Sequence, residues 1–318
     1  MNLFATIFYD WSRVVAGCFT WAGPLAVRIV VGFSPGGAAD TTARLIGQKL
    51  TEDTGQTFII ENRTGASGLI ANGRVATSPP DGYTLLFALT AQYAVNPTLY
   101  PKLPYDSLRD YIPVSLTATI GNCLIVHPSL PVKSVQELVA LAKARPGGLN
   151  YASAGNASAG HLAMELLKYQ TGTDLVHIAF KGGGPQVISS VSGETAVIFT
   201  TVPASIQHLR AGRLIGLGVS TLNRDPALPE VPTIAESGVP GYESSSPSGM
   251  FAPAKTPKSV ITRLNREILQ ALQTQEVKDR FREAAVEPVG TTPEEFGAII
   301  KAEVTKWRNV IKTAGIRE

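Results

Sequence analysis

Metal-binding and disulfide-forming patterns are missing from this sequence. Its 318 residues include two cysteines, Cys18 and Cys123, and four histidines scattered along the chain. CxxC and HExxH spacings are absent, so we expect no structural metal, no disulfide framework and no cofactor. Long runs of one charge are also absent, and the formal net charge is only +3. A nucleic-acid partner is therefore disfavoured, because such proteins gather lysine and arginine on one face.

Long apolar runs are few, and the N-terminal one is too short for an ordinary membrane span. Residues 14–27 carry no acidic or basic side chain and follow Arg13. Their length suits the apolar region of a signal peptide, whereas a membrane span needs roughly 20 residues. Asp10 lies where a signal carries positive charge, and the VAGC sequence ending at Cys18 resembles a lipoprotein processing box. We predict that residues 1–26 are a signal or anchor for export to the periplasm; a poorly ordered or misassigned N-terminus is the alternative.

A pattern that occurs three times is the strongest positive signal. Each instance is an apolar run, a glycine-rich loop and a helix-like stretch. The three sequences are VRIVVGFSPGGAAD (27–40), NYASAGNASAGH (150–161) and HIAFKGGGPQ (177–186). In an open α/β sheet such loops lie at the carboxyl ends of strands, where glycines leave backbone N–H groups accessible beside a helix N-terminus. The three loops therefore predict a cradle for a small anion.

Length and composition predict two α/β domains. Hydrophobic residues make up 44% of the chain and charged residues 17%, which is typical of a globular protein, and 318 residues exceed one ordinary core. The stretch 222–257 is rich in proline, glycine and serine and is predicted to be a surface crossing between domains. Short apolar runs predict strands at 27–32, 58–60, 84–88, 123–126, 150–154, 176–180, 196–199 and 214–219, with helices after several of them and over the last 60 or so residues.

Four motifs carry a resemblance to a known family: VRIVVGFSPGGAADTTAR, LNYASAGNASAGHLAMELL, AFKGGGPQ and LPEVPTIAESGVPGYE. In this order and spacing they resemble the substrate-binding receptors of tripartite tricarboxylate transporters, the Bug-type periplasmic receptors, over about residues 27–318. The resemblance implies a type II periplasmic-binding-protein fold, with two α/β domains, two crossings and a ligand cleft between the domains. The expected division is domain 1 at 27–125 plus 250–318 and domain 2 at 126–249.

The resemblance also implies a function without catalysis. The receptor would capture a small carboxylate by closing its two domains and deliver it to a membrane permease of a large and a small subunit. A monomer is expected, because such a receptor presents both domains to the permease. A ligand sensor for a signalling partner is the alternative, since it needs the same closing cleft.

The first loop is expected to bind the ligand through Phe33, Ser34, Gly36, Gly37 and Asp40. Gly36 and Gly37 are predicted to offer bare amides to a carboxylate, because side chains there would block its approach. Asp40 has two interpretations. It caps loop amides at the helix start, or it binds the amino group of an amino-acid ligand; repulsion of an anion favours the cap.

The second loop is expected to contribute Ser153, Gly155, Asn156, Ser158 and His161. Ser158 either caps the following helix or donates its hydroxyl to the ligand. His161 either braces the loop or contacts the ligand. Relatives have glycine more often at position 157, where this chain has alanine, which implies a different loop shape.

The third loop is expected to contribute Lys181 and Gly182. Lys181 is the one cation in the three loops, and it either offsets carboxylate charge or is a solvated surface lysine. Thr200 and Thr201 follow a predicted strand, and they either point hydroxyls into the cleft or begin the next turn. The family commonly places an aromatic residue near Pro247, and this chain lacks that ring. Its loss would reshape the pocket, so ligand specificity cannot be copied from a relative.

An enzyme is the competing class of protein, because Ser158, His161 and Asp40 suggest a hydrolase. The nucleophile elbow GxSxG is absent, and a serine and a histidine three residues apart at a helix start need not face one another. The phosphate loop GxxxxGK[ST] is absent as well. We therefore predict no enzymatic activity.

Overall fold

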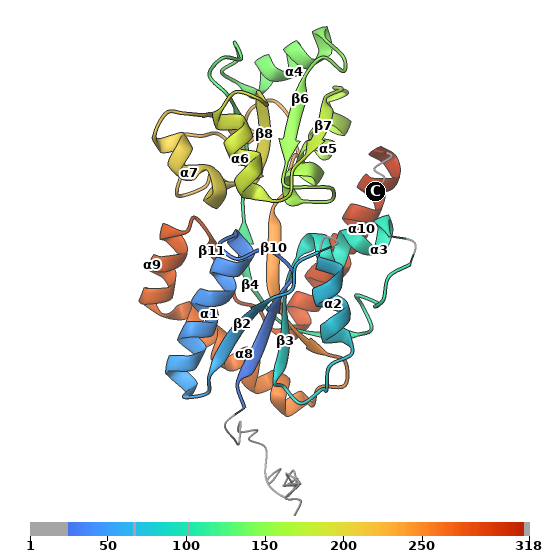
Figure 1. Ribbon diagram of the computed structural model, residues 1–318, viewed down its shortest axis with the longest axis vertical. Coiled ribbons are helices and arrows are strands. Elements are labelled where there is room, and N and C mark those ends of the chain that lie inside the picture. Colours follow the sequence, from blue (N-terminus) through green and yellow to red (C-terminus); the bar gives the residue numbers. More distant parts are fainter. Residues whose placement is uncertain (1–24, 66–67, 101, 315–318) are drawn as a thin grey trace, which may run out of the picture.

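Two sheets, one above the other in Figure 1, organise the protein. The computed structural model describes residues 25–65, 68–100 and 102–314. The first sheet contains, in spatial order, β11 (Glu287–Pro288), β4 (Tyr111–Ile120), β10 (Ser246–Pro253), β3 (Thr84–Leu89), β1 (Val27–Val31) and β2 (Phe58–Asn62). The second contains β7 (Val176–Ala179), β6 (Asn150–Ser153), β8 (Val197–Thr201), β5 (Asn122–Val126) and β9 (Ile215–Val219). Each sheet with its packed helices is called a unit below.

The first unit is built around parallel strands that are covered on both faces. β1 pairs with β2 and β3, with Val27 opposite Phe58 and Ile29 opposite Leu85. Its apolar sequence VRIVV is typical of strands buried between helices. One face packs against α1 (Ala38–Thr54), α8 (Lys258–Gln273) and α9 (Gln275–Glu283), and the other against α2 (Leu69–Ala76), η3 (Ala91–Val95), α3 (Asn96–Leu99) and α10 (Pro293–Ala314).

The second unit mixes parallel and antiparallel pairing. β6 is parallel to β7 and β8, whereas β5 is antiparallel to β8 and β9. α4 (Val135–Ala144) and α5 (Ala159–Thr171) pack on one face, and α6 (Gly183–Val191) and α7 (Val202–Arg210) on the other. α5 lies very close to β8, since a Cβ on Gly160 would be 1.8 Å from the carbonyl oxygen of Phe199. Only glycine fits this position without a shift of the backbone.

The chain passes between the units twice. Gly121 separates β4 from β5, and residues 220–245 connect β9 to β10. The two crossings are hydrogen-bonded to each other: the Asn122 side-chain amide donates to the Ser244 carbonyl at 3.0 Å, and the Ser220 hydroxyl donates to the same oxygen at 2.7 Å. Because sheet membership changes at these points, we propose domain boundaries at Gly121 and near Ser244, close to the predicted 125/126 and 249/250.

The expectation that residues 222–257 form only a surface crossing is wrong at its C-terminal end. β10 is a buried central strand that pairs antiparallel with both β3 and β4. Its polar sequence SPSGMFAP is compatible with burial because the Ser248 hydroxyl donates to the Ala118 carbonyl at 3.1 Å. Gly249 makes room for Phe296, whose ring would be 2.4 Å from an added Cβ. These contacts are long-range, so composition could not reveal the strand.

The predictions for the N-terminal segment, including Cys18 and export, fall mostly outside the described residues. Structure is described from Leu25 onward, and β1 begins two residues later at Val27, as predicted. Within the described ranges, no helix has both the length and the apolar character needed to cross a membrane.

Candidate ligand-binding site

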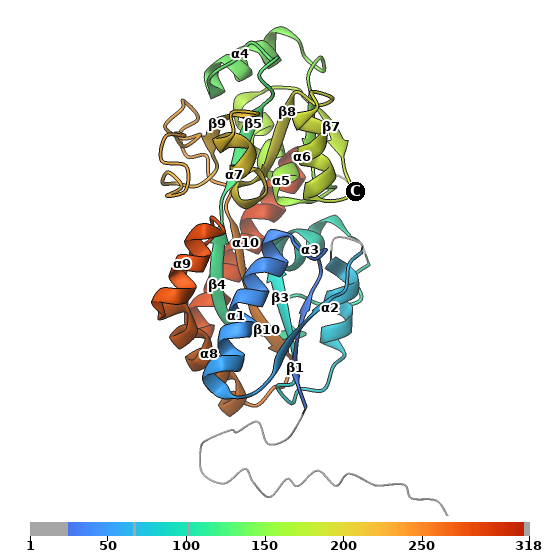
Figure 2. The same ribbon diagram turned by 60° about the vertical axis from the view of Figure 1, so that its left-hand side comes forward.

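The predicted loops lie at the edges where the two sheets face each other. α1 begins at the carboxyl end of β1 beside the second unit, and α5 and α6 begin at the carboxyl ends of β6 and β7 (Figures 1 and 2). The second and third loops are directly bonded, since the Phe180 amide donates to the Ser153 carbonyl at 2.9 Å and the Gly182 amide to the Ala154 carbonyl at 3.1 Å. The fold thus brings the second and third loops together and places the first loop on the opposing unit.

Asp40 is the centre of the first loop. One carboxylate oxygen accepts the Gly36 amide at 2.9 Å and the Arg44 Nε at 2.9 Å, and the other accepts the Asn62 side-chain amide at 2.8 Å. Asn62 also donates to the Phe33 carbonyl at 2.9 Å. Burial alone would raise the pKa of Asp40, but hydrogen bonds from Arg44, Gly36 and Asn62 outweigh it and hold the pKa below its ordinary value. The bond to Gly36 is the capping role predicted for Asp40.

The predicted bare amides of Gly36 and Gly37 are not bare. Gly36 donates to Asp40, and Gly37 donates to the Ser34 carbonyl at 3.4 Å. The unsatisfied donors lie in the residues that follow Gly37 directly. Among the described residues, the amides of Ala38, Ala39 and Asp40 have no acceptor, because the first turn of a helix has no preceding carbonyl to bond. The glycines leave open space beside these donors, since an added Cβ at Gly36 would meet nothing within 4 Å.

The second loop is held by hydrogen bonds at the start of α5. The Ser158 hydroxyl accepts the His161 amide at 3.4 Å, so its capping role is present, with long geometry. Nδ1 of His161 accepts the Ala157 amide at 3.0 Å, which is the loop-bracing role. Ala157 has φ 57°, a left-handed conformation that glycine adopts at lower cost. Alanine therefore occupies a backbone conformation here that suits glycine better, at a cost in strain.

Three stacked rings lie behind the second loop, and two of them were missed by the sequence analysis. The His161 ring stacks on His177 at 4.0 Å between centroids, and His177 stacks on Tyr151 at 4.9 Å. The Ser153 hydroxyl bonds Nε2 of His177 at 2.6 Å. Burial lowers the pKa of His161 to about 3, and His177 and Lys168 add to this effect. Burial also lowers the pKa of His177. No local pattern in the sequence marked these rings, because the parallel register of β6 and β7 is what sets Tyr151 opposite His177.

The third loop is open on its outer side. An added Cβ at Gly182, Gly183 or Gly184 would meet nothing within 4 Å, and the amides of Gly183 and Gly184 in the first turn of α6 have no acceptor among the described residues. Lys181 is exposed and makes no ion pair with any described residue. The first turn of α6 is thus a second set of free N–H donors, opposite the set on α1.

The two threonines occupy the end of β8. Thr200 is buried. Thr201 is the N-cap residue of α7, but its side chain makes no capping bond. Asn156 and Gly155 lie at the tip of the second loop, where Asn156 is exposed. No group of His, Cys, Asp or Glu in the described ranges could hold a metal ion.

Comparison with known proteins gives this arrangement a family. Residues 42–316 match the family model described as the tripartite tricarboxylate transporter family receptor. The chain belongs to this family. Its fold is accordingly that of the two-domain periplasmic binding proteins, as the resemblance in the sequence implied.

Solved structures extend over nearly the whole chain. Rpa4515 of R. palustris with adipate is 39% identical, with a TM-score of 0.87. The match covers 92% of this chain and 98% of the Rpa4515 chain. MatC of Rhodopseudomonas palustris with bound malate is 30% identical, with a TM-score of 0.82 and coverages of 90% and 98%. The periplasmic binding protein BugD is 28% identical, with a TM-score of 0.84 and coverages of 92% and 98%. The solved proteins that resemble this chain thus include periplasmic binding proteins.

Proposed function

We propose that this receptor binds a small carboxylate between its two units, by backbone amides, and performs no chemistry on it. The observation that carries the proposal is the pair of unsatisfied helix starts. The free N–H groups of Ala38 and Ala39 belong to one unit, and those of Gly183 and Gly184 belong to the other. Helix N-termini favour anions through their exposed donors and the helix dipole. Two such ends on opposite units suit a ligand with a carboxylate at each end.

The neighbouring structures support the class of ligand. Adipate and malate, the molecules named with two of them, are both dicarboxylates. Thr200 at the end of β8 and Ser158 at the start of α5 would add hydroxyls from the second unit. Lys181 is the cation that would balance part of the ligand's charge. Asp40 would not contact the ligand's carboxylate, because its oxygens are already occupied by Gly36, Arg44 and Asn62.

The remaining parts of the proposal concern transport. We infer that the chain is exported to the periplasm, acts there as a monomer and delivers its ligand to a permease of a large and a small subunit. The family of receptors to which it belongs supports this role. Closure by rotation about the two crossings would shield the ligand from water and present both units to the permease.

Calorimetric titration with adipate, malate, citrate and glutamate tests the binding step. The protein is first unfolded, dialysed and refolded, so that no co-purified ligand occupies the site. We expect one class of carboxylate to bind with a stoichiometry of one. Gly37→Val should abolish this binding, because its side chain would crowd the free N–H groups of Ala38 and Ala39. The fold should stay intact, since Gly37 has φ −78° and an added Cβ would make only an ordinary contact, 3.5 Å from the Ser34 carbonyl oxygen.

Gly297→Ala on α10 is the matched control, since its added Cβ would also make an ordinary contact, 3.7 Å from Pro113. It should bind as the unchanged protein does. Failure of every carboxylate to bind the refolded receptor would overturn the proposed function, and unchanged affinity in Gly37→Val would remove the first loop from the site.

A further inference from the structure

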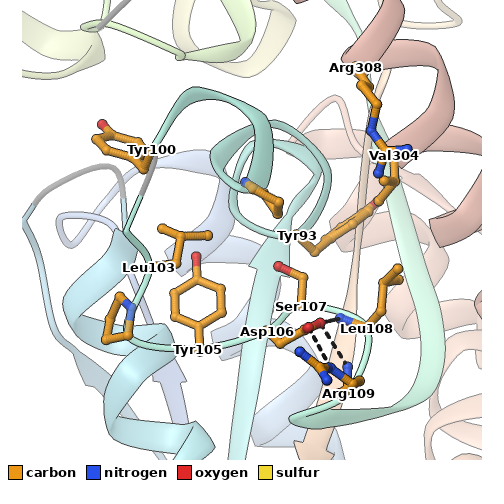
Figure 3. A pocket seen from close by; sticks show the side chains of 12 residues that line it. Tyr93, Tyr100, Leu103, Tyr105, Asp106, Ser107, Leu108, Arg109, Val304 and Arg308 are labelled. Carbon is orange, nitrogen blue, oxygen red and sulfur yellow. Dashed lines mark hydrogen bonds and ion pairs between the residues drawn. The ribbon is translucent and has the colours of Figure 1, made fainter.

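A hollow on the side of the first unit is separate from the loops described above. It has a volume of about 560 Å³ and lies between η3, the segment 103–109 and α10 (Figure 3). None of the residues predicted to bind the carboxylate lines it. Its volume is within the range of about 300–1,000 Å³ that is typical of small-molecule sites.

Tyrosine rings form walls of this hollow. The Tyr105 hydroxyl donates to the Gln92 carbonyl at 3.1 Å, and the Tyr93 hydroxyl donates to the Pro247 carbonyl at 3.3 Å. Both hydroxyls are thus bonded to the protein, and the rings present only narrow apolar strips to the hollow, since Tyr93 is 2% and Tyr105 is 6% exposed. Val304 of α10 adds an aliphatic side. Such a lining suits the edge of an aromatic ligand, because aromatic rings also meet in edge-to-face contacts.

Ser107 supplies an unpaired polar group. The residue is 7% exposed, and its hydroxyl has no hydrogen-bond partner among the described residues. Figure 3 shows this hydroxyl facing the space beside Tyr105 and Tyr93. Buried hydroxyls are normally hydrogen-bonded, so this one calls for a partner that occupies the hollow.

One basic side chain that lines the hollow has no acidic partner among the described residues. Arg109 is paired with Asp106 at 2.6 Å, and Asp106 also accepts the Leu108 amide at 2.9 Å. Arg308 makes no ion pair or hydrogen bond with any described residue, and Figure 3 shows its side chain beside Val304 and above Tyr93. The guanidinium group is therefore free to pair with a carboxylate from a ligand.

We propose that this hollow is a second small-molecule site, specific for a monoanion with a flat apolar body, such as an aromatic carboxylate. The edge of the ligand's ring contacts Tyr93 and Tyr105, and its carboxylate pairs with Arg308. The Ser107 hydroxyl donates a hydrogen bond to the ligand. This site is independent of the carboxylate site between the units, because the two share no residue.

A fluorine NMR titration with 4-fluorobenzoate, using the full chain, tests this proposal. We expect saturable binding that Arg308→Gln weakens at least tenfold. Leu108→Trp should remove it, because Leu108 lines the hollow, is 51% exposed and can be enlarged without disturbing the core. Lys301→Gln is the matched control, since it removes one charge from the same helix without touching the hollow; its affinity should stay within twofold of that of the unchanged protein.

The titration is repeated in Gly37→Val, whose change lies in the first loop. Retained binding there, together with its loss in Arg308→Gln, assigns the probe to the hollow. Binding that disappears in Gly37→Val and survives in Arg308→Gln and Leu108→Trp would overturn the proposal, because the probe would then occupy the site between the units. No binding of 4-fluorobenzoate to the unchanged protein would overturn it as well.

Discussion

The first and second loops hold the same kind of backbone by different chemistry. In the first unit a buried, ionised Asp40 gathers donors from Gly36, Arg44 and Asn62. In the second unit a buried, neutral His161 accepts the loop amide and stacks on His177. A carboxylate can serve in the first loop because Arg44 already neutralises it. A loop that we propose to bind an anion can therefore be fixed by a negative charge, provided that the charge is paired away from the ligand.

The helices behind these loops differ in how closely they approach their sheets. α5 touches β8 through Gly160, whose added Cβ would be 1.8 Å from a backbone oxygen. α1 approaches β2 through Gly47, whose added Cβ would be 3.1 Å from the end of the Ile60 side chain. A side-chain end can move, whereas a strand carbonyl cannot. The second loop is therefore attached to the more rigid support.

Alanine substitution at these two glycines should show the largest difference. We expect Gly160→Ala to cost more than about 4 kcal/mol of unfolding free energy or to prevent folding, because backbone must move. Gly47→Ala should stay within about 1 kcal/mol of the unchanged protein, since a better helix former offsets the shift of Ile60. Urea unfolding followed by circular dichroism measures both. Equal costs would show that the two supports are alike.

Removal of the first loop's carboxylate should have the next largest effect. Asp40→Ala leaves the Gly36 amide and the Asn62 amide without their acceptor, so we expect a loss of roughly 2–3 kcal/mol. Asp53→Ala is the control on the same helix; it removes a partly exposed ion pair with Lys49 and should cost less than about 1 kcal/mol. Chemical unfolding compares the two variants. A cost for Asp40→Ala no greater than that for Asp53→Ala would contradict the anchoring role.

As the pH falls, the stabilising contributions of His161 and Asp40 should be lost over different pH ranges. The pKa of His161 is about 3 in the folded protein and about 6.5 when exposed, so the unfolded chain binds the extra proton first and stability falls as the pH drops below about 6.5. The slope from this residue is at most about 1.4 kcal/mol per pH unit. Asp40, whose pKa is lowered, loses its contribution only as the pH falls below the ordinary value of 3.8.

Unfolding free energies at pH 7, 6, 5 and 4.5 test this order. His161→Phe should make the fall in stability over this range less steep, with the remainder coming from His177, whose pKa is also lowered by burial, whereas Asp40→Ala should leave the slope unchanged. A slope that does not respond to His161→Phe would mean that another group takes up the proton.

The smallest expected effect concerns the Ser158 cap. Its bond to the His161 amide is long, so Ser158→Ala should cost about 1 kcal/mol or less. Ser134→Ala, which removes the analogous cap of α4 at 3.1 Å, provides the matched comparison. If Ser158→Ala weakens carboxylate binding by more than it weakens the fold, the hydroxyl contacts the ligand; a loss of stability alone would leave Ser158 as a cap.

The sequence was informative where local pattern determines structure. β1, its loop and the start of α1 followed from an apolar run, paired glycines and Asp40, because these features act over a few residues. The positions of the free amides did not follow, because the Asp40 carboxylate turns back onto Gly36. The stack of His161 on His177 was also hidden, since strand register sets it. β10 was missed because contacts with Ala118 and Phe296, remote in sequence, compensate its polar composition.

The bonded crossings limit how the two units can move. The Asn122 amide and the Ser220 hydroxyl share the Ser244 carbonyl, and the Ser220 amide donates to the Asn122 carbonyl at 2.8 Å. These bonds hold the two crossings side by side, and turning about the line through them would leave them intact. We therefore expect the units to turn about this line, with Val310 of α10, which packs against the core of the second unit, as a third contact that limits how far they open.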